Sequence, residues 1–588
     1  MSFSTNMSKS ISSTNEDEEH DLGYGPKFLS TISVNTLGPD SKSSDDTNVV
    51  EKSESISEPA KHPTLKKGLQ SRHVQLIALG GAIGTGLFVG TSSSLETCGP
   101  GGLLISYIVI STVIFPIMNA FGEMVSFMPG LDGAESAGSS AHLVYKYVDK
   151  SLGFATSWNY YYCYVMLVAA ECTAASGVVT YWTNVIPQAA LITIFLAIIV
   201  GLNFTPVQFY GESEFWLAIT KILCILGLII LSFILFWGGG PTHDRLGFRY
   251  WKDPGVFAHH LAEGCLGGFL DIYTGIIKGS FAFILGPELV CLTSSECQDQ
   301  RRNISKAAGR FVYRLMFFYI LGALSITVIV AYNNPTLIDS LNANKPGAGS
   351  SPFVIGIQSA GITVLPHIIN LCILLSACSA GNAFMFASTR SLLTMANTGN
   401  APKIFRKINK NGVPYMGVLV STMLASLAYL NVTASTATVF NWFSNISVVS
   451  GFIGWICASI AYIRFRKAIE YRGILDRVPF KGWGQPYLLY YSLILISIIT
   501  ITNGYAIFLN GHWNFADFVA AYITLPVFVA LLLGHKIYSK TLFKAWWYPT
   551  QEIDVLTGLD EIELLTKELD ENRKPPTNIW ERFLDWLL

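Results

Sequence analysis

Long apolar stretches alternate with short polar loops along most of this chain. Stretches of about twenty apolar residues are long enough to cross a bilayer as helices. Twelve such stretches occur, at approximately 73–95, 102–123, 154–182, 187–205, 210–237, 274–295, 311–332, 360–389, 414–431, 438–463, 485–509 and 516–535. The pattern therefore predicts an all-α polytopic membrane protein with twelve transmembrane helices.

Basic residues and the two ends of the chain set the predicted orientation and domains. The loops after the sixth, eighth and tenth stretches are rich in Lys and Arg, whereas the alternate loops contain few, which places both termini in the cytosol. We expect a disordered cytosolic tail over 1–71, which is rich in Ser, Asp and Glu. The twelve-helix domain then covers 72–538, and a cytosolic C-terminal tail covers 539–588.

Composition agrees with a membrane protein. Hydrophobic residues make up 51% of the chain and charged residues 13%, against about 25% in soluble domains, and the mean hydropathy is +0.42. The formal net charge of −1 argues against a nucleic-acid partner, because phosphates require a basic surface.

Four glycines crowd the first apolar stretch, in LGGAIGTGLF at 79–88. Each destabilises a helix interior by about 1 kcal/mol relative to alanine, so the cluster predicts a broken helix that lines a ligand cavity. The amides around Gly84, Thr85 and Gly86 would then face an anion such as a carboxylate. The alternative is close packing of small residues between helices.

The sixth stretch has a matching irregularity in FAFILGPE, where Gly286 and Pro287 fall at mid-membrane. Two broken spans five helices apart predict an inverted repeat of five plus five helices, with two further helices outside it. Carbonyls of Phe281, Ala282 and Ile284 would accept hydrogen bonds from an amine. A ligand with a carboxylate at one break and an amine at the other would be an α-amino acid. The alternative for the sixth stretch is a simple proline kink in a packed helix, which does not explain the matching break in the first stretch.

Three ionisable residues lie within apolar stretches. Lys221 and Glu171 are each isolated in a span, where a charge costs about 2.5–3.5 kcal/mol at the helix centre. Burial disfavours the charged form, so both are candidates for proton coupling, and Glu171 also for the substrate pocket. The alternatives are a snorkelling lysine and a structural carboxylate. Glu288, at the second half of span six, is either a coupling residue or a helix cap.

Six motifs resemble the yeast amino acid permeases of the amino acid/polyamine/organocation superfamily. They are GGAIGTGLFVG, DKSLGFATSWNYYY, FWLAITKI, FAFILGPEL, STRSLLTMANTGNAPKIFRKINKNGVPY and VFNWFSNIS, in this order from residue 80 to 447. IIKGSFAFILGPELVC, GAGSSPFVIGIQ and TITNGYAIF are most similar to the fungal proline permeases within that family. Lys278 departs from the wider family, which mostly has an uncharged residue there.

The resemblance implies a plasma-membrane importer driven by the proton gradient, with ubiquitin-ligase machinery acting on its cytosolic tails. It also implies that Lys221 and Glu171 serve coupling and substrate selection. The expected substrate-binding residues are Ile83, Gly84, Thr85, Gly86, Glu171, Phe281, Ala282, Phe283 and Ile284, and the expected coupling residues are Lys221, Glu171 and Glu288. We expect no metal and no cofactor.

Proline is the expected substrate, with small neutral amino acids as weaker ones. Phe281 and Phe283 would enclose its ring, and burying three methylenes contributes roughly 2.4 kcal/mol at about 0.8 kcal/mol each. A general neutral amino acid permease and an amino acid sensor of the same fold remain alternatives. An enzyme is disfavoured, because the ionisable residues within the spans are scattered singly. A sodium-coupled carrier is disfavoured because Lys221 would repel the ion.

Two smaller questions stay open at the level of sequence. Trp442, Asn445 and Ser447 either line the pocket or form an interfacial belt and a helix cap. Cys98 and Cys265 fall in loops predicted outside, where a disulfide would persist if the two sulfurs met.

Overall fold

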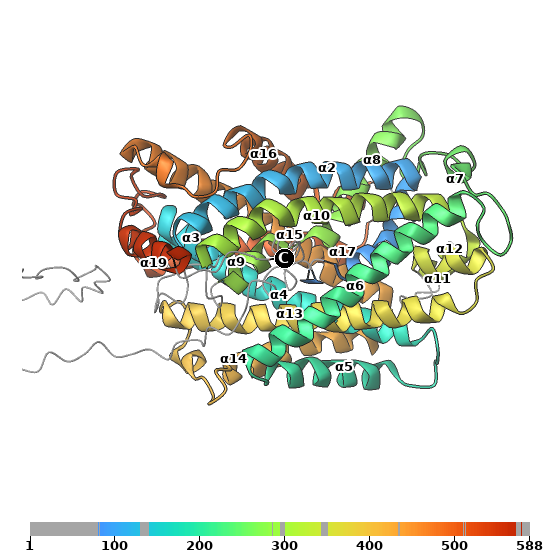
Figure 1. Ribbon diagram of the computed structural model, residues 1–588, viewed down its shortest axis with the longest axis horizontal. Helices are drawn as coiled ribbons and strands as arrows, with labels where there is room; N and C mark the ends of the chain where they lie inside the picture. Colours follow the sequence, from blue (N-terminus) through green and yellow to red (C-terminus); the bar gives the residue numbers. More distant parts are fainter. Residues whose placement is uncertain are drawn as a thin grey trace, which may run out of the picture. The chain divides into compact units, whose positions relative to one another are not determined.

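Every regular element that the structure describes is a helix (Figure 1). The structure is a computed structural model that describes residues 80–81, 83–129, 140–284, 286–294, 300–342, 351–432, 436–509, 511, 513–571 and 578. The predicted N-terminal tail, 1–71, lies outside the described residues.

Seven long helices form the body of the domain, and shorter helices flank them. The long ones are α2 (Thr91–Phe127), α4 (Lys150–Val179), α6 (Val207–Phe236), α8 (Gly264–Phe283), α10 (Gln300–Ile329), α13 (Leu365–Asn397) and α15 (Thr436–Arg472). The shorter ones used below are η1 (Gly86–Gly90), α3 (Ser140–Tyr147), α5 (Gln188–Asn203), α9 (Gly286–Ser294), α14 (Tyr415–Ala425), α16 (Tyr487–Thr502), η6 (Tyr505–Phe508), α17 (Phe515–Tyr522), α18 (Thr524–Tyr538) and α19 (Leu559–Glu571).

Eight helices in the described ranges are long and apolar enough to cross a membrane, or nine if α17 and α18 form one bent span. This number is lower than the twelve predicted. One reason is that η1 and α2 run on as a single helical segment, Gly86–Phe127, across a kink at Gly99 (φ 72°, ψ 175°). The other is that α5 and α16 are apolar but only 16 residues long.

Local signals in the sequence set the ends of several helices. The Asp149 carboxylate accepts hydrogen bonds from the amides of Ser151 and Leu152 at 2.8 and 3.1 Å, which caps the start of α4. At the end of α13, Gly399 takes a φ of +79°, and the Asn400 amide donates back to the Met395 carbonyl. Glycine suits this left-handed position because it has no Cβ.

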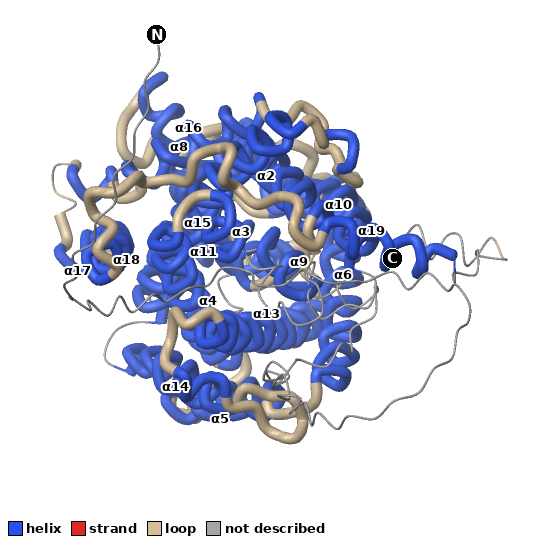
Figure 2. Tube along the Cα trace, turned by 90° about the vertical axis from the view of Figure 1, so that its left-hand side faces the viewer, coloured by secondary structure: helices blue, strands red, loops and turns tan. Residues whose placement is uncertain are grey.

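The long helices pack in two groups that meet at the helix breaks. In the first group α2 packs against α8 and α10, and in the second α4 packs against α13, α5 and α14. Figure 2 looks along the bundle, with α2, α8 and α10 above α4 and α13. The buried rings of Tyr107, Phe283 and Tyr319 pack together inside the first group, so the hydrophobic core extends to the end of α8.

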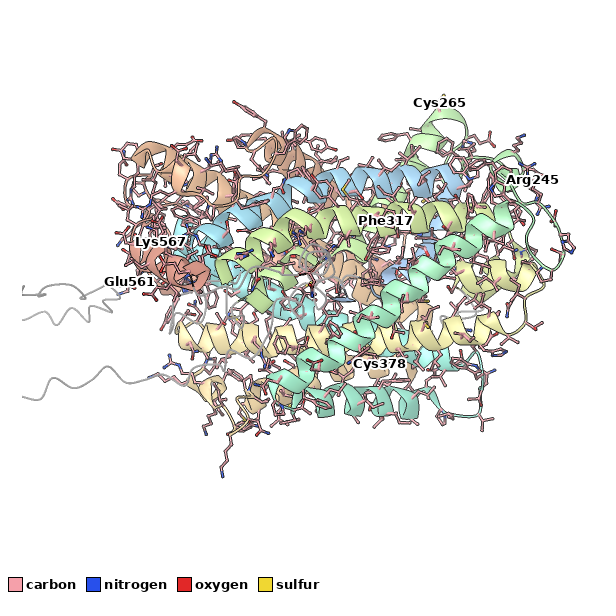
Figure 3. The ribbon with its side chains drawn as sticks, viewed as in Figure 1. Arg245, Cys265, Phe317, Cys378, Glu561 and Lys567 are labelled. Carbon is pink, nitrogen blue, oxygen red and sulfur yellow. The ribbon has the colours of Figure 1, made fainter. Side chains whose placement is uncertain are left out.

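Part of the predicted C-terminal tail is folded against the ends of the helices. The Tyr548 amide donates to the Val148 carbonyl at 2.9 Å, and Arg477 pairs with Asp560 and Glu563 of α19 at 2.6 and 3.0 Å. The hydrogen bond from Arg477 lowers the pKa of Glu563. Figure 3 places α19, with Glu561 and Lys567, at the opposite end of the bundle from Arg245 and Cys265.

Candidate functional site

The first helix break lies at the glycine cluster. Ile83 and Gly84 are non-helical bends between a helical turn at 80–81 and the π-helix η1. The Ser376 hydroxyl on α13 donates to the Ile83 carbonyl at 3.2 Å, which satisfies one of the freed backbone groups. The break is therefore buried in protein and held by a neighbouring helix.

The glycines of this break serve two different contacts. A Cβ on Gly86 would lie 2.7 Å from the Ala282 Cα atom, so the two broken spans touch backbone to backbone. A Cβ on Gly84 would instead lie 3.3 Å from the Glu171 Oε1 atom. Close helix packing thus accounts for Gly86, whereas Gly84 leaves room beside a carboxyl group.

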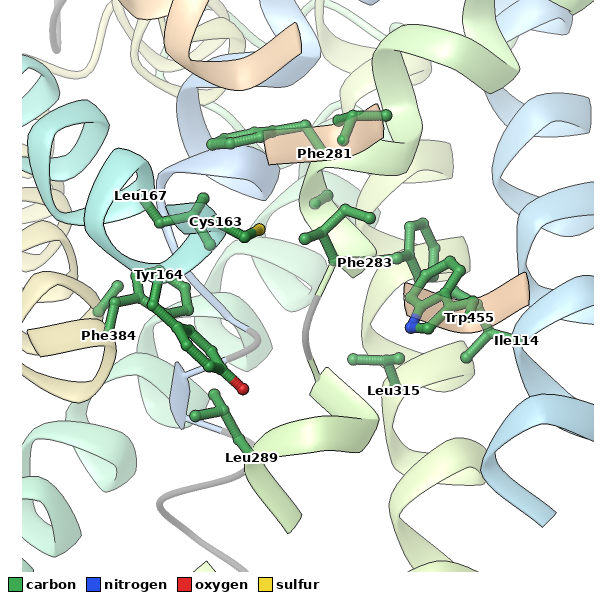
Figure 4. Packing of buried hydrophobic residues seen from close by; sticks show 14 of the residues in the cluster. Ile114, Cys163, Tyr164, Leu167, Phe281, Phe283, Leu289, Leu315, Phe384 and Trp455 are labelled. Atoms are coloured by element: carbon green, nitrogen blue, oxygen red, sulfur yellow. The ribbon is translucent and has the colours of Figure 1, made fainter. Parts of the chain in front are cut away.

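The second break separates α8 from α9. Helix α8 ends at Phe283, Ile284 is extended (φ −60°, ψ 139°), and α9 begins at Gly286. Figure 4 shows this interruption between Phe283 and Leu289. The Tyr319 hydroxyl donates to the Ala282 carbonyl at 2.7 Å, so this predicted acceptor already has a partner. Nothing in the sequence around Tyr319 marked it for this role.

Glu171 lies directly against the first break. Its side chain, on α4, is 3% exposed, and its Oε1 atom accepts a hydrogen bond from the Thr85 hydroxyl at 3.0 Å. The other oxygen, Oε2, is buried without a hydrogen-bond partner among the described residues. An unpaired buried carboxyl oxygen is costly, so this atom is available for a proton or a ligand.

Lys221 holds the other side of the same break. Its ammonium, on α6 and 2% exposed, donates to the Gly80 carbonyl at 2.5 Å. A Cβ on Gly80 would lie 2.8 Å from the Ala218 Cβ atom, which brings α6 close enough for this bond. Glu171 and Lys221 therefore lie on either side of the same break.

A buried carboxylate that the sequence analysis missed lies two turns before Lys221. Glu214 is fully buried and accepts hydrogen bonds from Ser379 and Asn382 of α13, both at 2.6 Å. It lies near the start of the apolar stretch 210–237, where an acidic residue is common and does not indicate burial. The available signal was its seven-residue spacing from Lys221, which puts both side chains on one helix face.

Glu288 belongs to a different cluster. Its Oε1 atom accepts a hydrogen bond from the Tyr160 hydroxyl at 3.0 Å, and Ser140 donates to that hydroxyl in turn. Its Oε2 atom is buried without a partner in the described part of the chain. The predicted coupling residues thus divide, with Lys221 and Glu171 at the first break and Glu288 against α4.

The two phenylalanines expected to enclose the substrate ring lie on different sides of α8. Phe281 lines a cavity of about 290 Å³ and contacts Phe440 edge to face at 5.4 Å. Phe283 packs against Tyr107 and Tyr319, with ring centroids 5.4 and 4.4 Å apart. Only Phe281 is therefore placed to contact a ligand in this cavity.

The remaining candidates fall beside this cavity or away from it. Asn445 lines the cavity, whereas Trp442 donates to the Asp517 carboxylate at 3.0 Å. Ser447 is buried, and its carbonyl accepts a hydrogen bond from the Cys163 thiol. Cys98 and Cys265 are free thiols, the first buried and the second exposed. In the described ranges no three His, Cys, Asp or Glu side chains gather as metal ligands.

Comparison with known proteins assigns the family. The chain is 69% identical to the proline-specific permease of Saccharomyces cerevisiae, over 92% of this chain and 86% of that protein. It is 47% identical to the proline-specific permease of Emericella nidulans, over 90% and 94%, and 48% identical to a probable proline-specific permease of Schizosaccharomyces pombe, over 86% and 90%. Residues 73–547 match the amino acid permease family. This multi-pass membrane protein, with its two broken and buried helices, therefore belongs to the amino acid permease family.

Proposed function

We propose that this protein is a proton-coupled importer of amino acids in the plasma membrane, with proline preferred and small neutral amino acids as weaker substrates. The observation that carries the proposal is the pair of buried ionisable side chains, Glu171 and Lys221, on either side of the broken first span. The printed names of the three similar permeases support proline as the substrate.

The free backbone at the breaks suits a secondary amine. Proline carries two ammonium protons, whereas primary amino acids carry three. Tyr319 already donates to the Ala282 carbonyl, so of the three expected acceptors Phe281 and Ile284 are the better placed to receive the amine. Two carbonyls are enough for the two ammonium protons of proline, whereas a primary amine would need a third acceptor. The substrate carboxylate would lie at Gly84 and Thr85.

We further propose twelve spans arranged as two inverted halves, with both termini in the cytosol. The kink at Gly99 would divide η1 and α2 into spans one and two, and α5, α16 and the bent pair α17–α18 would complete the set. The pattern of helix contacts supports the repeat. In an inverted repeat α2 would correspond to α10, α4 to α13, α5 to α14 and α6 to α15. When each of these eight helices is replaced by its counterpart, every pair in contact becomes a pair that is also in contact. Thus α6 packs on α10 and α13, and α15 on α2 and α4.

Competition for uptake tests the substrate. Labelled proline would be offered at acidic pH to yeast that lack their own permeases and express this chain. We expect unlabelled proline to compete strongly, alanine and glycine weakly, and lysine and glutamate not at all. Strong competition by leucine or phenylalanine would instead indicate a general permease. Surface expression without any uptake would favour a sensor.

Replacement of Lys221 tests the coupling. Lys221→Met keeps the length and apolar stem of the side chain but cannot carry a proton. We expect it to abolish uptake driven by a pH gradient while the protein still reaches the cell surface. Unchanged gradient-driven uptake by this variant would refute coupling through Lys221.

A further inference from the structure

We infer that the cavity between α8, α15, η6 and α17 is a second amino acid binding site, which receives the zwitterionic substrate from outside before it reaches the helix breaks. The inference rests on the proposed transport function. It also gives a role to η6 and α17, which lie outside the proposed repeat.

The cavity has the size and lining of a small-molecule site. Its volume of about 290 Å³ is near the lower end of ligand pockets. Its walls come from α8, α15, η6, α17, the residues after α16, and Gly90 and Ser93 of the first broken span. Both apolar rings and polar groups contribute, including Phe281, Phe440, Ser444 and Asn503.

The walls carry one charge of each sign. Lys278, on α8, donates to the hydroxyls of Ser93 and Thr97 at 2.8 and 3.3 Å, and no carboxylate in the described ranges lies within ion-pair distance of it. Asp517, on α17, accepts one hydrogen bond from Trp442. A zwitterion presents a carboxylate to such an ammonium and an amine to such a carboxylate, so both charges of an amino acid find a partner.

Two polar groups of the cavity have no protein partner. The Asn503 side chain is 7% exposed, and neither its amide nitrogen nor its amide oxygen forms a hydrogen bond within the described part of the chain. The Ser444 hydroxyl is also buried and unpaired among those residues. Buried polar groups are normally satisfied, and a group left unpaired indicates a ligand or water. Asn503 offers both a donor and an acceptor, which suits the two ends of an amino acid.

Two aromatic rings of the cavity wall lie close to the second helix break. Phe281 and Phe440 both line the cavity and contact each other edge to face. In Figure 4 Phe281 lies on α8 shortly before the interruption that follows Phe283. Substrate in the cavity would therefore rest on this ring pair, and movement of the Phe281 ring would admit it to the breaks.

Equilibrium binding of radiolabelled proline to the purified full-length protein tests the inference. We expect two equivalents of proline per chain for the wild type and one for Asn503→Leu, which removes both polar groups at similar volume. Asn333→Leu is the matched control, because Asn333 is exposed and lies outside the cavity. It should bind two equivalents.

The outcomes separate this inference from the proposed function. One equivalent for the wild type, or two for Asn503→Leu, would overturn the second site and leave proline transport standing. No binding by the wild type would overturn both. If Asn503→Leu does not fold, Ser444→Ala provides the test, since losing one hydrogen bond should weaken the outer site about fivefold. An unchanged two-site isotherm for that variant would contradict the assignment.

Discussion

Replacing Gly86 with alanine tests how closely the two broken spans must approach. The added methyl carbon would lie 2.7 Å from the Cα atom of Ala282 and 3.1 Å from its amide nitrogen. Carbon atoms in contact are normally about 3.5–4.0 Å apart. The two spans must therefore separate by roughly 0.8 Å, because the obstacle is backbone and cannot rotate away.

The size of the effect follows from this displacement. Overpacking of a buried site generally destabilises a protein by about 1–3 kcal/mol. Each kcal/mol expressed at the substrate site weakens binding about fivefold. Because Ala282 lies in the last turn of α8, directly before the second break, we expect Gly86→Ala to lose both thermal stability and affinity for proline, the latter by at least fivefold.

A second glycine provides the control. Gly227 lies within α6, and a Cβ there would meet no atom within 4 Å. Alanine favours a helix by about 1 kcal/mol over glycine, so Gly227→Ala should be neutral or stabilising. Thermal unfolding in detergent and the concentration dependence of proline uptake would measure both variants. Equal behaviour of Gly86→Ala and Gly227→Ala would refute the close approach of the two spans.

Four further expectations concern other parts of the molecule. Glu214→Gln should keep hydrogen bonds to α13 and the fold but reduce pH-driven uptake, whereas Glu214→Leu should lower thermal stability as well. Lys536→Met should destabilise by about 3–5 kcal/mol, because it leaves a buried partner charge, and adding Asp149→Asn should restore part of that loss in thermal unfolding. A membrane-impermeant maleimide should label Cys265 in intact cells, since that thiol is exposed. The pKa of Glu563 is lowered from its ordinary value of 4.5, so its ion pair contributes fully to the stability of α19 when the pH is above 4.5. This contribution is lost as the pH falls below that value. Proteolysis of α19 should therefore increase only below about pH 4.5.

The sequence was sufficient to locate the breaks and the isolated charges, because both are local signals. Glycines at 80, 81, 84 and 86, and the Gly-Pro pair after Ile284, weaken a helix wherever it packs. Lys221 and Glu171 stand alone in apolar stretches, so burial and a nearby partner were expected of both. Their distances to the first break depend on how the helices pack against each other, and local sequence signals carry no information about that packing.

Contacts between distant helices account for what the sequence did not reveal. Tyr319 reaches the Ala282 carbonyl only because α10 packs beside α8, and Glu214 meets α13 in the same way. The expectation for Phe283 neglected helix geometry. Residues two apart differ by about 200° around a helix, so Phe281 and Phe283 point to opposite sides. The span count differed because a kinked helix continues through Gly99 and because α5 and α16 are short.

The position of Glu171 offers a physical reason for coupling proton and amino acid. The Thr85 hydroxyl that donates to Glu171 lies where we place the substrate carboxylate. Two carboxylates about 4 Å apart repel by roughly 4 kcal/mol at an effective dielectric constant of 20. A protonated Glu171 would remove that repulsion and could itself donate to the substrate, so under the proposed coupling the loaded site would hold one proton with each amino acid. Lys221, hydrogen-bonded to Gly80 across the same break, could take up this proton only as a neutral amine, so under the proposed coupling it would be neutral in the loaded site, accept the proton as the substrate leaves, and then release it to the cytosol.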